Sequence, residues 1–303
     1  MTRPGSDLAR PGPVPATRPA PWDYAAHWGT RGYITDLGGP VYWIEFAADH
    51  GRNQPTDQPE TQDRNQPGAL PPIVFVHGLG GSHLNWCLLG PHLTAGRRVV
   101  ALDLRGFGLT PGLRVNSTVQ ANARLLDRFI TEVIGTPVIL AGNSMGGLIT
   151  ILETAANPDA IDGVVLIDPA LPLPLQKPDW EVSAQFLVYA LPGLGDLAAR
   201  RRPATPAQAS ARARVFLASA RSLLRVLGRR QRYARVMAGI DVPVLLIGGD
   251  ADRLVPVAAI RQAGARNPRW ETVILAGVGH TPQLEVPGAV AVAIRGWLDR
   301  HAT

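Results

Sequence analysis

The stretch ILAGNSMGGL, residues 139–148, is an apolar run that ends in a serine with a glycine two residues to either side. Pro137 to Ala141 is typical of a buried strand, and Gly147 to Ala156 of an apolar helix that stops at Asn157-Pro158. A chain that turns from strand to helix within two or three residues strains the residue at the apex, and the glycines leave room for the crossing. The pattern predicts that Ser144 stands clear of the sheet as a nucleophile.

A serine hydroxyl is a weak nucleophile at neutral pH, so this chemistry needs a base. His280 lies in the glycine-rich turn AGVGHTP, residues 276–282, directly after the strand-like run Thr272 to Leu275. A histidine on a loop after a buried strand can reach across the carboxyl edge of a sheet, and His280 is therefore the predicted base. His77, at the end of another strand, is more typical of a histidine that braces its loop through hydrogen bonds.

Asp252 is the predicted acid that orients this imidazole and stabilises its charged form. It follows the apolar run Val244 to Ile247, and it completes the chain order Ser, Asp, His. Asp250 is a close rival, because two carboxylates two residues apart on a loop cannot both point at one imidazole. Asp168, which also ends a strand, could serve from an adjacent position or could instead cap loop amides.

Backbone N–H groups are expected to hold the oxyanion of such a reaction. Met145 follows the nucleophile and would supply one of them. The second is assigned to Leu79, in the loop HGLGGS at residues 77–82, which follows the strand-like run Ile73 to Val76. The glycines of this loop let the main chain pass close to a substrate oxygen.

Four blocks in this order give the chain a resemblance to the α/β-hydrolase superfamily: HGLGGS at 77, DLRGFG at 103, GNSMGG at 142, and GGDADRLVP at 248 followed by GVGHTPQLE at 277. The resemblance implies a mostly parallel, eight-stranded twisted sheet with helices on both faces and a helical cap inserted after the sixth strand. It also implies a Ser-Asp-His triad, a carboxylesterase-like serine hydrolase, and no cofactor or metal. Haloalkane dehalogenases and epoxide hydrolases of this fold use an aspartate at the elbow, so Ser144 excludes those subclasses.

The bond that is cut follows less directly from these motifs. The GNSMGG elbow resembles that of meta-cleavage-product hydrolases, which cut carbon–carbon bonds. In that family an aromatic residue commonly follows the catalytic histidine, whereas Thr281 follows His280 here. This difference favours a small-molecule substrate, a carboxylic ester of an apolar acyl group. A ligand receptor or signalling protein that retains the triad but has little turnover remains an alternative.

A chain of 303 residues with 46% hydrophobic content can bury one large core, and its alternation of strand-like and helical runs favours an α/β sheet. Tyr33 to Leu37 and Val41 to Phe46 are typical of a hairpin. The predicted parts are a disordered Pro/Arg-rich tail (1–21), an α/β-hydrolase core (22–169 and 236–303) with a flexible polar loop (49–70), and a helical, arginine-rich cap (170–235).

The single cysteine, Cys87, cannot form an internal disulfide and is expected to be inert core. The first twenty residues lack the continuous apolar stretch of a secretory signal, and no run approaches a membrane span. A cytoplasmic protein is therefore expected.

Positive charge concentrates in the predicted cap. From Leu197 to Arg235 the chain has 11 arginines and no Asp or Glu, although its overall net charge is only +6. Pro206 to Leu227 has the pattern of an amphipathic helix, whose apolar face would carry Phe216, Ala220, Leu223 and Leu227. A solvated helix face packed over the active site is the favoured interpretation, and weak contact with an anionic membrane surface is the alternative. Nucleic acid is not expected as a partner, because the segment has few aromatic residues for base stacking.

Overall fold

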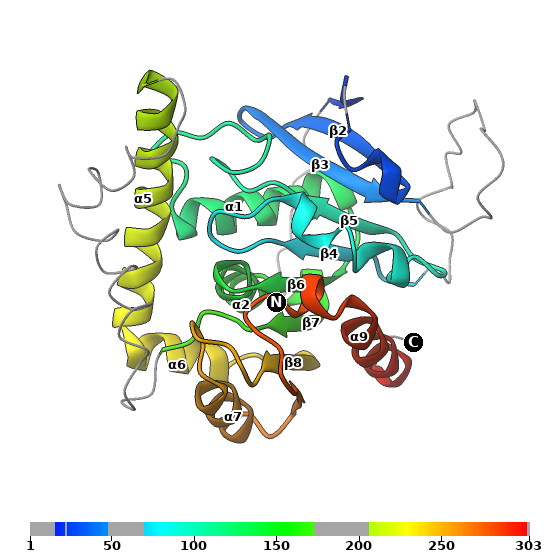
Figure 1. Ribbon diagram of the computed structural model, residues 1–303, viewed down its shortest axis with the longest axis vertical. Helices are drawn as coiled ribbons and strands as arrows, with labels where there is room; N and C mark the ends of the chain where they lie inside the picture. Colours follow the sequence, from blue (N-terminus) through cyan, green and yellow to red (C-terminus); the bar gives the residue numbers. More distant parts are fainter. Residues whose placement is uncertain (1–15, 22, 48–69, 173–205, 302–303) are drawn as a thin grey trace, which may run out of the picture.

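The computed structural model describes residues 16–21, 23–47, 70–172 and 206–301, with side chains described from Ala213 onward in the last of these ranges. They form a nine-stranded sheet in the order β1-β2-β3-β5-β4-β6-β7-β8-β9, flanked by helices (Figure 1). The strands are β1 (Thr17–Pro19), β2 (Thr30–Asp36), β3 (Pro40–Phe46), β4 (Ile73–Val76), β5 (Val99–Leu102), β6 (Val138–Asn143), β7 (Ile161–Ile167), β8 (Val244–Gly249) and β9 (Trp270–Leu275). The α-helices are α1 (Val119–Phe129), α2 (Met145–Ala156), α5 (Pro206–Gly228), α6 (Arg230–Ala238), α7 (Val257–Arg266), α8 (Pro282–Glu285) and α9 (Pro287–His301). Short helical turns are η1 (Ala26–Trp28), η2 (His83–Trp86), η3 (Gly90–Leu93), η4 (Ile130–Ile134) and η5 (Pro158–Ala160).

The sheet is mostly parallel, as predicted. Strands β4 to β9 pair in parallel, and β1, β2 and β3 extend one side of the sheet in antiparallel pairing. The predicted hairpin is confirmed as β2 and β3, whose register closes at Asp36 opposite Pro40. The sheet has one strand more than the eight that the resemblance implied.

The additional strand is β1, and it corrects the prediction of a disordered tail over residues 1–21. Thr17 to Pro19 pair with β2, and the hydroxyl of Thr17 lies 2.8 Å from that of Thr35. Pro19 lacks an N–H group, which is tolerated here because β1 is the edge strand of the sheet. Composition alone did not reveal this pairing, because a Pro/Arg-rich stretch gains its partner only from the folded sheet. Residues 1–15, residues 49–69 of the predicted polar loop (49–70) and residues 173–205 of the predicted cap lie outside the described residues.

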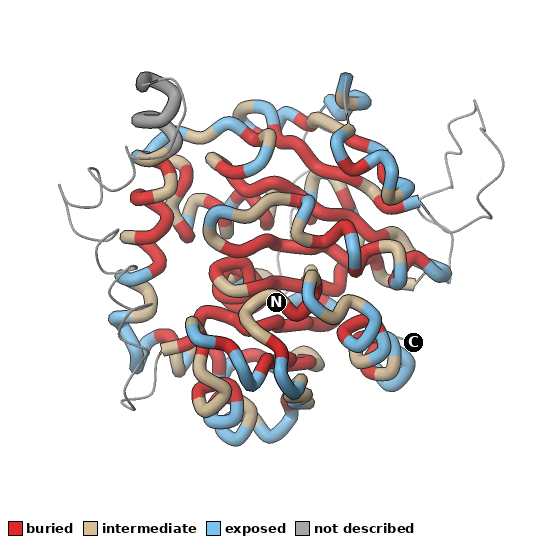
Figure 2. The backbone as a smooth tube through the Cα atoms, viewed as in Figure 1, coloured by how far each residue is buried: buried red, intermediate tan, exposed pale blue. Residues whose placement is uncertain are grey.

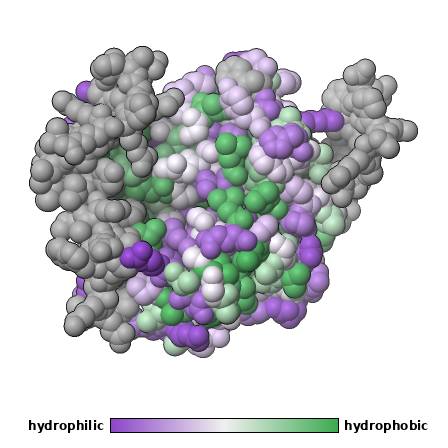
Figure 3. All heavy atoms as spheres, viewed as in Figure 1, coloured by the Kyte–Doolittle hydropathy of each residue, from purple (hydrophilic) through white to green (hydrophobic). Residues whose placement is uncertain are grey.

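Two apolar clusters cover the two faces of the sheet, because successive strand residues point to opposite sides. In β4, Val74 and Val76 belong to the cluster that includes residues of α1, α2, α6 and α7, whereas Ile73 and Phe75 belong to the cluster with α9. Buried residues accordingly follow the strands and the inner sides of the helices (Figure 2). The surface seen in Figure 3 interleaves hydrophilic and apolar residues. Helices on both faces of the sheet are therefore confirmed.

Helix α5 is the amphipathic helix that the sequence predicts. Ala220 and Leu223 are buried, and Phe216 and Leu227 pack partly buried against the core. Polar contacts also fasten α5 to the beginning of α1. The Ser222 hydroxyl accepts a hydrogen bond of 2.8 Å from the Val119 N–H, and the Ser219 hydroxyl donates to the Ser117 carbonyl oxygen. The helix is thus held over the core by both apolar packing and buried hydrogen bonds.

Cys87 is buried as expected, and burial raises the pKa of its thiol to about 12, so the thiolate that would make it reactive is not formed at neutral pH. None of the helices in the described ranges is both long enough and apolar enough to cross a membrane.

We predict that Ser222→Ala destabilises the protein by about 1–3 kcal/mol, because the buried N–H of Val119 would lose its acceptor. Urea unfolding followed by circular dichroism measures the change. The control is Arg225→Ala, at an exposed position of the same helix, which should change the free energy of unfolding by no more than about 0.5 kcal/mol. Equal effects of the two substitutions would contradict the proposed docking of α5.

Candidate active site

The candidate site lies at the carboxyl edge of the parallel strands. Loops that follow β4, β6, β7, β8 and β9 all leave the sheet at this edge, because these strands run in the same direction. These loops carry every residue that the sequence singled out for the chemistry. Strand pairing therefore brings together residues that are far apart in the chain.

Ser144 occupies the strained turn between β6 and α2. Its backbone has φ 55° and ψ −119°, a conformation that costs a non-glycine residue about 1–3 kcal/mol. Two hydrogen bonds hold it there: its N–H donates to the Ile167 carbonyl oxygen at 3.2 Å, and its own carbonyl oxygen accepts from the Ala170 N–H at 2.9 Å. A Cβ at Gly146 would collide with the carbonyl oxygen of Val76, so only glycine lets α2 approach β4 this closely. The predicted strained apex is confirmed.

His280 contacts Asp252, as the sequence predicted for an imidazole and its orienting acid. Nδ1 of His280 lies 2.7 Å from Oδ2 of Asp252. The other carboxylate oxygen accepts the N–H groups of Leu254 at 2.6 Å and Val255 at 3.1 Å, which fixes the rotamer. A proton on Nδ1 satisfies this contact, and Nε2 is then the nitrogen that can accept a proton.

Asp250, the rival acid, serves a different purpose. Its carboxylate is exposed and accepts the Gly277 N–H at 2.6 Å, in the turn that leads to His280. Asp252 is buried, with only 7% of its surface exposed. Of these two carboxylates, the structure places only Asp252 against the imidazole.

Asn143 joins the elbow to the histidine loop, and sequence reasoning missed this role. Its Nδ2 donates to the carbonyl oxygen of His280 at 3.1 Å and to that of Ile167 at 3.0 Å. The residue directly before Ser144 is thus hydrogen-bonded to the backbone of His280. Within the described residues no hydrogen bond joins the Ser144 hydroxyl to the imidazole, and such contacts often tighten only when substrate is bound. The amide before the serine in GNSMGG was the signal available in the sequence.

The loop after β4 passes beside Ser144. A Cβ placed on Gly78 would lie 3.1 Å from that of Ser144, so the loop backbone and the serine are neighbours. The next residue, Leu79, was assigned one oxyanion donor and Met145 the other. In the described structure neither of these N–H groups donates a hydrogen bond to another protein atom.

Asp168, the third carboxylate considered, is fully buried beside Asp252. Its φ is 40°, and in the described ranges Asp168 and Ser144 are the two non-glycine residues with a positive φ. Both of its oxygens lie 3.2 Å from the Gly249 N–H, and its carboxyl group is hydrogen-bonded to Asp252. Burial, followed by the charge of Asp252, raises the pKa of Asp168 to about 9.

His77 braces the loop, as its position at a strand end predicted. Nδ1 donates to the Gly78 carbonyl oxygen at 2.8 Å, and Nε2 accepts the Leu104 N–H at 3.1 Å. This pair of contacts requires a neutral ring with its proton on Nδ1. Complete burial lowers the pKa of His77, in agreement with that neutral state.

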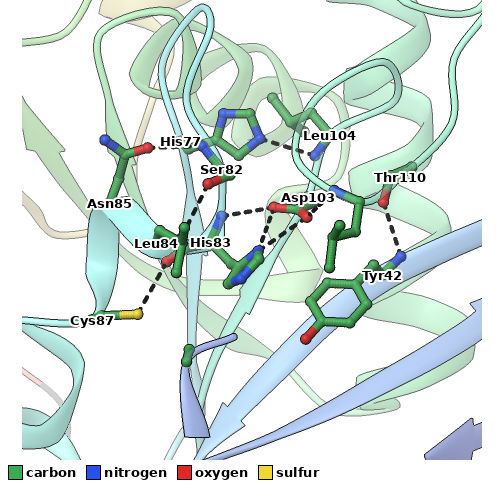
Figure 4. A network of polar contacts seen from close by, with 12 residues as sticks. Tyr42, His77, Ser82, His83, Leu84, Asn85, Cys87, Asp103, Leu104 and Thr110 are labelled. Atoms are coloured by element: carbon green, nitrogen blue, oxygen red, sulfur yellow. Dashed lines mark hydrogen bonds and ion pairs between the residues drawn. The ribbon is translucent and has the colours of Figure 1, made fainter. Parts of the chain in front are cut away.

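A buried pair, His83 and Asp103, supports the same loop and was missed in the sequence (Figure 4). One oxygen of Asp103 accepts the His83 N–H at 2.7 Å and lies 2.9 Å from Nδ1 of the ring, and the other accepts the Leu109 N–H at 2.7 Å. A Cβ at Gly108, whose φ is +54°, would collide with the Asp103 carboxylate. The aspartate and glycine of DLRGFG were the signal for this arrangement.

Glu285 is hydrogen-bonded to the loop that carries His280, another role that the sequence analysis did not assign. Its carboxylate accepts the Gly279 N–H at 2.7 Å and the Thr281 N–H at 3.0 Å. These hydrogen bonds, led by that of Gly279, lower the pKa of Glu285. A glutamate four residues after Thr281, at the last position of α8, was the available signal.

The remaining candidates for a site are a cavity away from this edge and a metal-binding cluster. An open cavity of about 610 Å³ lies near the end of α2 that is remote from Ser144, and it is lined by Ala155, Arg232, Arg235, Val236 and Gly239. Among the side chains that the structure describes, no group of three or more His, Cys, Asp and Glu could hold a metal ion.

Known proteins share both the sequence motifs and the architecture of this chain. The acetyltransferase component of the acetoin cleaving system of Pseudomonas putida is 26% identical over 293 residues, covering 86% of this chain and 75% of that protein. The 2-hydroxy-6-oxo-6-(2'-aminophenyl)hexa-2,4-dienoic acid hydrolase of Metapseudomonas resinovorans is 25% identical over 248 residues, covering 76% and 85%. The crystal structure of a membrane phospholipase A, a bacterial virulence factor, is 26% identical with a TM-score of 0.65, covering 91% and 88%.

A mostly parallel sheet with a strained serine at the carboxyl edge of its strands is typical of the α/β-hydrolases. The sequence profile of the alpha/beta hydrolase family matches residues 73–293, and the chain belongs to that family.

We predict that Asp103→Asn lowers the free energy of unfolding by about 1–3 kcal/mol for each donor left without an acceptor, because an amide NH₂ would replace one of the accepting oxygens. Urea unfolding measures the loss. Asp159→Asn, at an exposed site, is the matched control and should shift stability by no more than about 0.5 kcal/mol. An Asp103→Asn variant with an unchanged free energy of unfolding would show that this network does not stabilise the fold.

Proposed function

We propose that this protein is a serine hydrolase that cleaves a carboxylic ester of an apolar acyl group. Ser144 acts as the nucleophile, His280 as the general base and Asp252 as the residue that orients the imidazole. The observation that carries the proposal is the serine at a strained apex, attached through Asn143 to a histidine whose Nδ1 contacts a buried carboxylate.

The reaction would proceed in two acyl transfers. The Ser144 hydroxyl attacks the ester carbonyl carbon while Nε2 of His280 removes its proton, which then passes to the departing alcohol. Water attacks the resulting acyl-serine, and His280 again removes the proton and returns it to the serine oxygen. Asp252 stabilises the imidazolium that forms in each step. Neither step needs a cofactor.

The oxyanion formed in each step would be held by the N–H groups of Leu79 and Met145. Met145 is the first residue of α2, and the N-terminus of a helix favours negative charge. Donors that are already positioned stabilise the transition state without reorganising during the reaction. That neither N–H donates within the described protein supports this assignment.

The preference for an apolar acyl group rests on what α5 places beside the oxyanion loop. A Cβ on Gly80 would lie 3.4 Å from Cε2 of Phe216, so this ring covers the loop next to Leu79. Leu79 itself is partly buried against the same apolar cluster. An acyl chain bound near the oxyanion donors would therefore meet apolar side chains. The similarity to a phospholipase A structure agrees with an ester substrate.

Carbon–carbon bond hydrolysis is the second candidate, and the similarity to the Metapseudomonas hydrolase favours it. The same serine, imidazole and oxyanion donors would act on a ketone carbonyl in a ring-fission product. Measuring turnover of both a simple ester and such a dienoic acid separates the two activities.

We predict that a fluorophosphonate probe labels Ser144 alone. Ser144→Ala should abolish labelling and lower kcat for a short p-nitrophenyl ester on the order of 10⁴-fold or more, because the nucleophile is removed. Peptide mass spectrometry locates the label, and circular dichroism checks that the variant is folded. Labelling without multiple turnover would support the receptor alternative, and full activity in the folded Ser144→Ala variant would refute the assignment.

We also predict an activity optimum at medium acyl chain length in a series of p-nitrophenyl esters. Each added methylene should raise kcat/KM as long as it can be buried against the apolar surface around Phe216 and Leu79. Steady-state kcat/KM across the series measures this. A response that does not vary with chain length would contradict selection of an apolar acyl group.

A further inference from the structure

Asp168 is a buried acid at the candidate site to which the proposed mechanism assigns no step. It directly follows β7, which lies between β6, the strand that precedes Ser144, and β8, the strand whose loop carries Asp252. Its side chain has no exposed surface, and its φ of 40° is strained for a residue other than glycine. Strain at buried, polar positions is maintained only where surrounding contacts over-determine it.

The contacts of Asp168 form a chain that reaches the imidazole. Its carboxyl group accepts the Gly249 N–H and is hydrogen-bonded to the carboxyl group of Asp252. Asp252 in turn contacts Nδ1 of His280 at 2.7 Å. Two carboxyl groups can share a hydrogen bond only if one of them keeps its proton.

The surroundings decide which of the two acids is protonated. Asp252 receives three donors, namely the ring of His280 and the N–H groups of Leu254 and Val255, all of which favour its ionised form. From the described residues, Asp168 receives one backbone donor, the Gly249 N–H. The charged groups that act on Asp168 are Asp252 and, more weakly, Glu285, and both are acids. Asp168 is therefore the protonated partner.

We propose that Asp168 is a positioning residue, whose carboxylic proton bonds Asp252 and keeps it turned toward His280, so that removal of this proton at alkaline pH inactivates the site. This inference rests on the proposed hydrolase function. Once ionised, Asp168 could no longer donate this hydrogen bond and would repel the carboxylate of Asp252. Asp252 would move, and the imidazole would lose its orientation.

The direction of the pH effect follows from the buried environment. Because the pKa of Asp168 is raised to about 9, the proton is retained through the neutral range and lost as the pH rises through that value. Hydrolysis should therefore fall on the alkaline side near pH 9. A group with an ordinary carboxyl pKa could not produce a loss at this pH.

The test is the pH dependence of kcat/KM for a short p-nitrophenyl ester, corrected for spontaneous hydrolysis, in wild type and Asp168→Asn. Asparagine cannot ionise, yet its NH₂ can donate to Asp252 and its oxygen can accept from Gly249. We expect it to keep the neutral-pH rate within about threefold and to abolish the alkaline decline. Below the alkaline decline, where wild type still holds the bonding proton, Asp168→Ala should lose roughly ten- to a hundredfold, the usual effect of losing a hydrogen bond to a charged group.

Asp250→Asn is the matched control, because Asp250 is a nearby carboxylate that is exposed and does not contact His280. This variant should retain the alkaline decline. An unchanged decline in Asp168→Asn would overturn the positioning role alone. A wild-type protein without ester turnover at any pH would overturn the proposed function, and this inference with it.

If Asp168→Asn does not fold, infrared spectroscopy of wild type labelled with ¹³C-carboxyl aspartate decides the matter. The label distinguishes Asp168 from Glu153, a buried glutamate whose pKa burial raises to about 7. A protonated aspartate band should be present at neutral pH and disappear near pH 9. Absence of that band at neutral pH would overturn the proposal.

Discussion

The turn between β6 and α2 is the constraint on which the site depends. Ser144 adopts its strained backbone because its neighbours leave no alternative: the end of β7 accepts its N–H, Ala170 donates to its carbonyl oxygen, and Gly146 packs against Val76. The apolar core behind these contacts stabilises the fold by far more than the strain costs. The strained turn also places the Ser144 hydroxyl and the N-terminus of α2 at one point of the sheet edge.

Rigid supports surround this turn. His77 and the pair of Asp103 and His83 hold the loop after β4, while Glu285 holds the loop after β9. All of these side chains satisfy backbone N–H or C=O groups that would otherwise lack partners near the core. The chemistry proposed here needs donors and acceptors in place before substrate arrives, and these contacts provide that order.

Three carboxylates close to one histidine loop show how environment assigns function to identical chemical groups. Asp250 is exposed and caps a turn, Asp252 accepts two N–H groups beside the imidazole, and Asp168 is buried and accepts the Gly249 N–H. Burial, followed by the charge of Asp252, then raises the pKa of Asp168. The same principle makes His77 a neutral brace, whereas His280 is partly exposed beside Asp252.

The sequence by itself determined the local units: the strand, turn and helix around Ser144, the loop that contains Leu79, and the strand that precedes each candidate acid. Apolar periodicity and glycine spacing encode such units within a few residues. Only the tertiary structure decided which acid meets His280, that Asn143 joins the serine to the histidine loop 137 residues away, and that residues 17–19 form an edge strand. These outcomes depend on which loops the sheet order brings together, and hydrogen bonds between distant segments leave no periodic pattern in the chain.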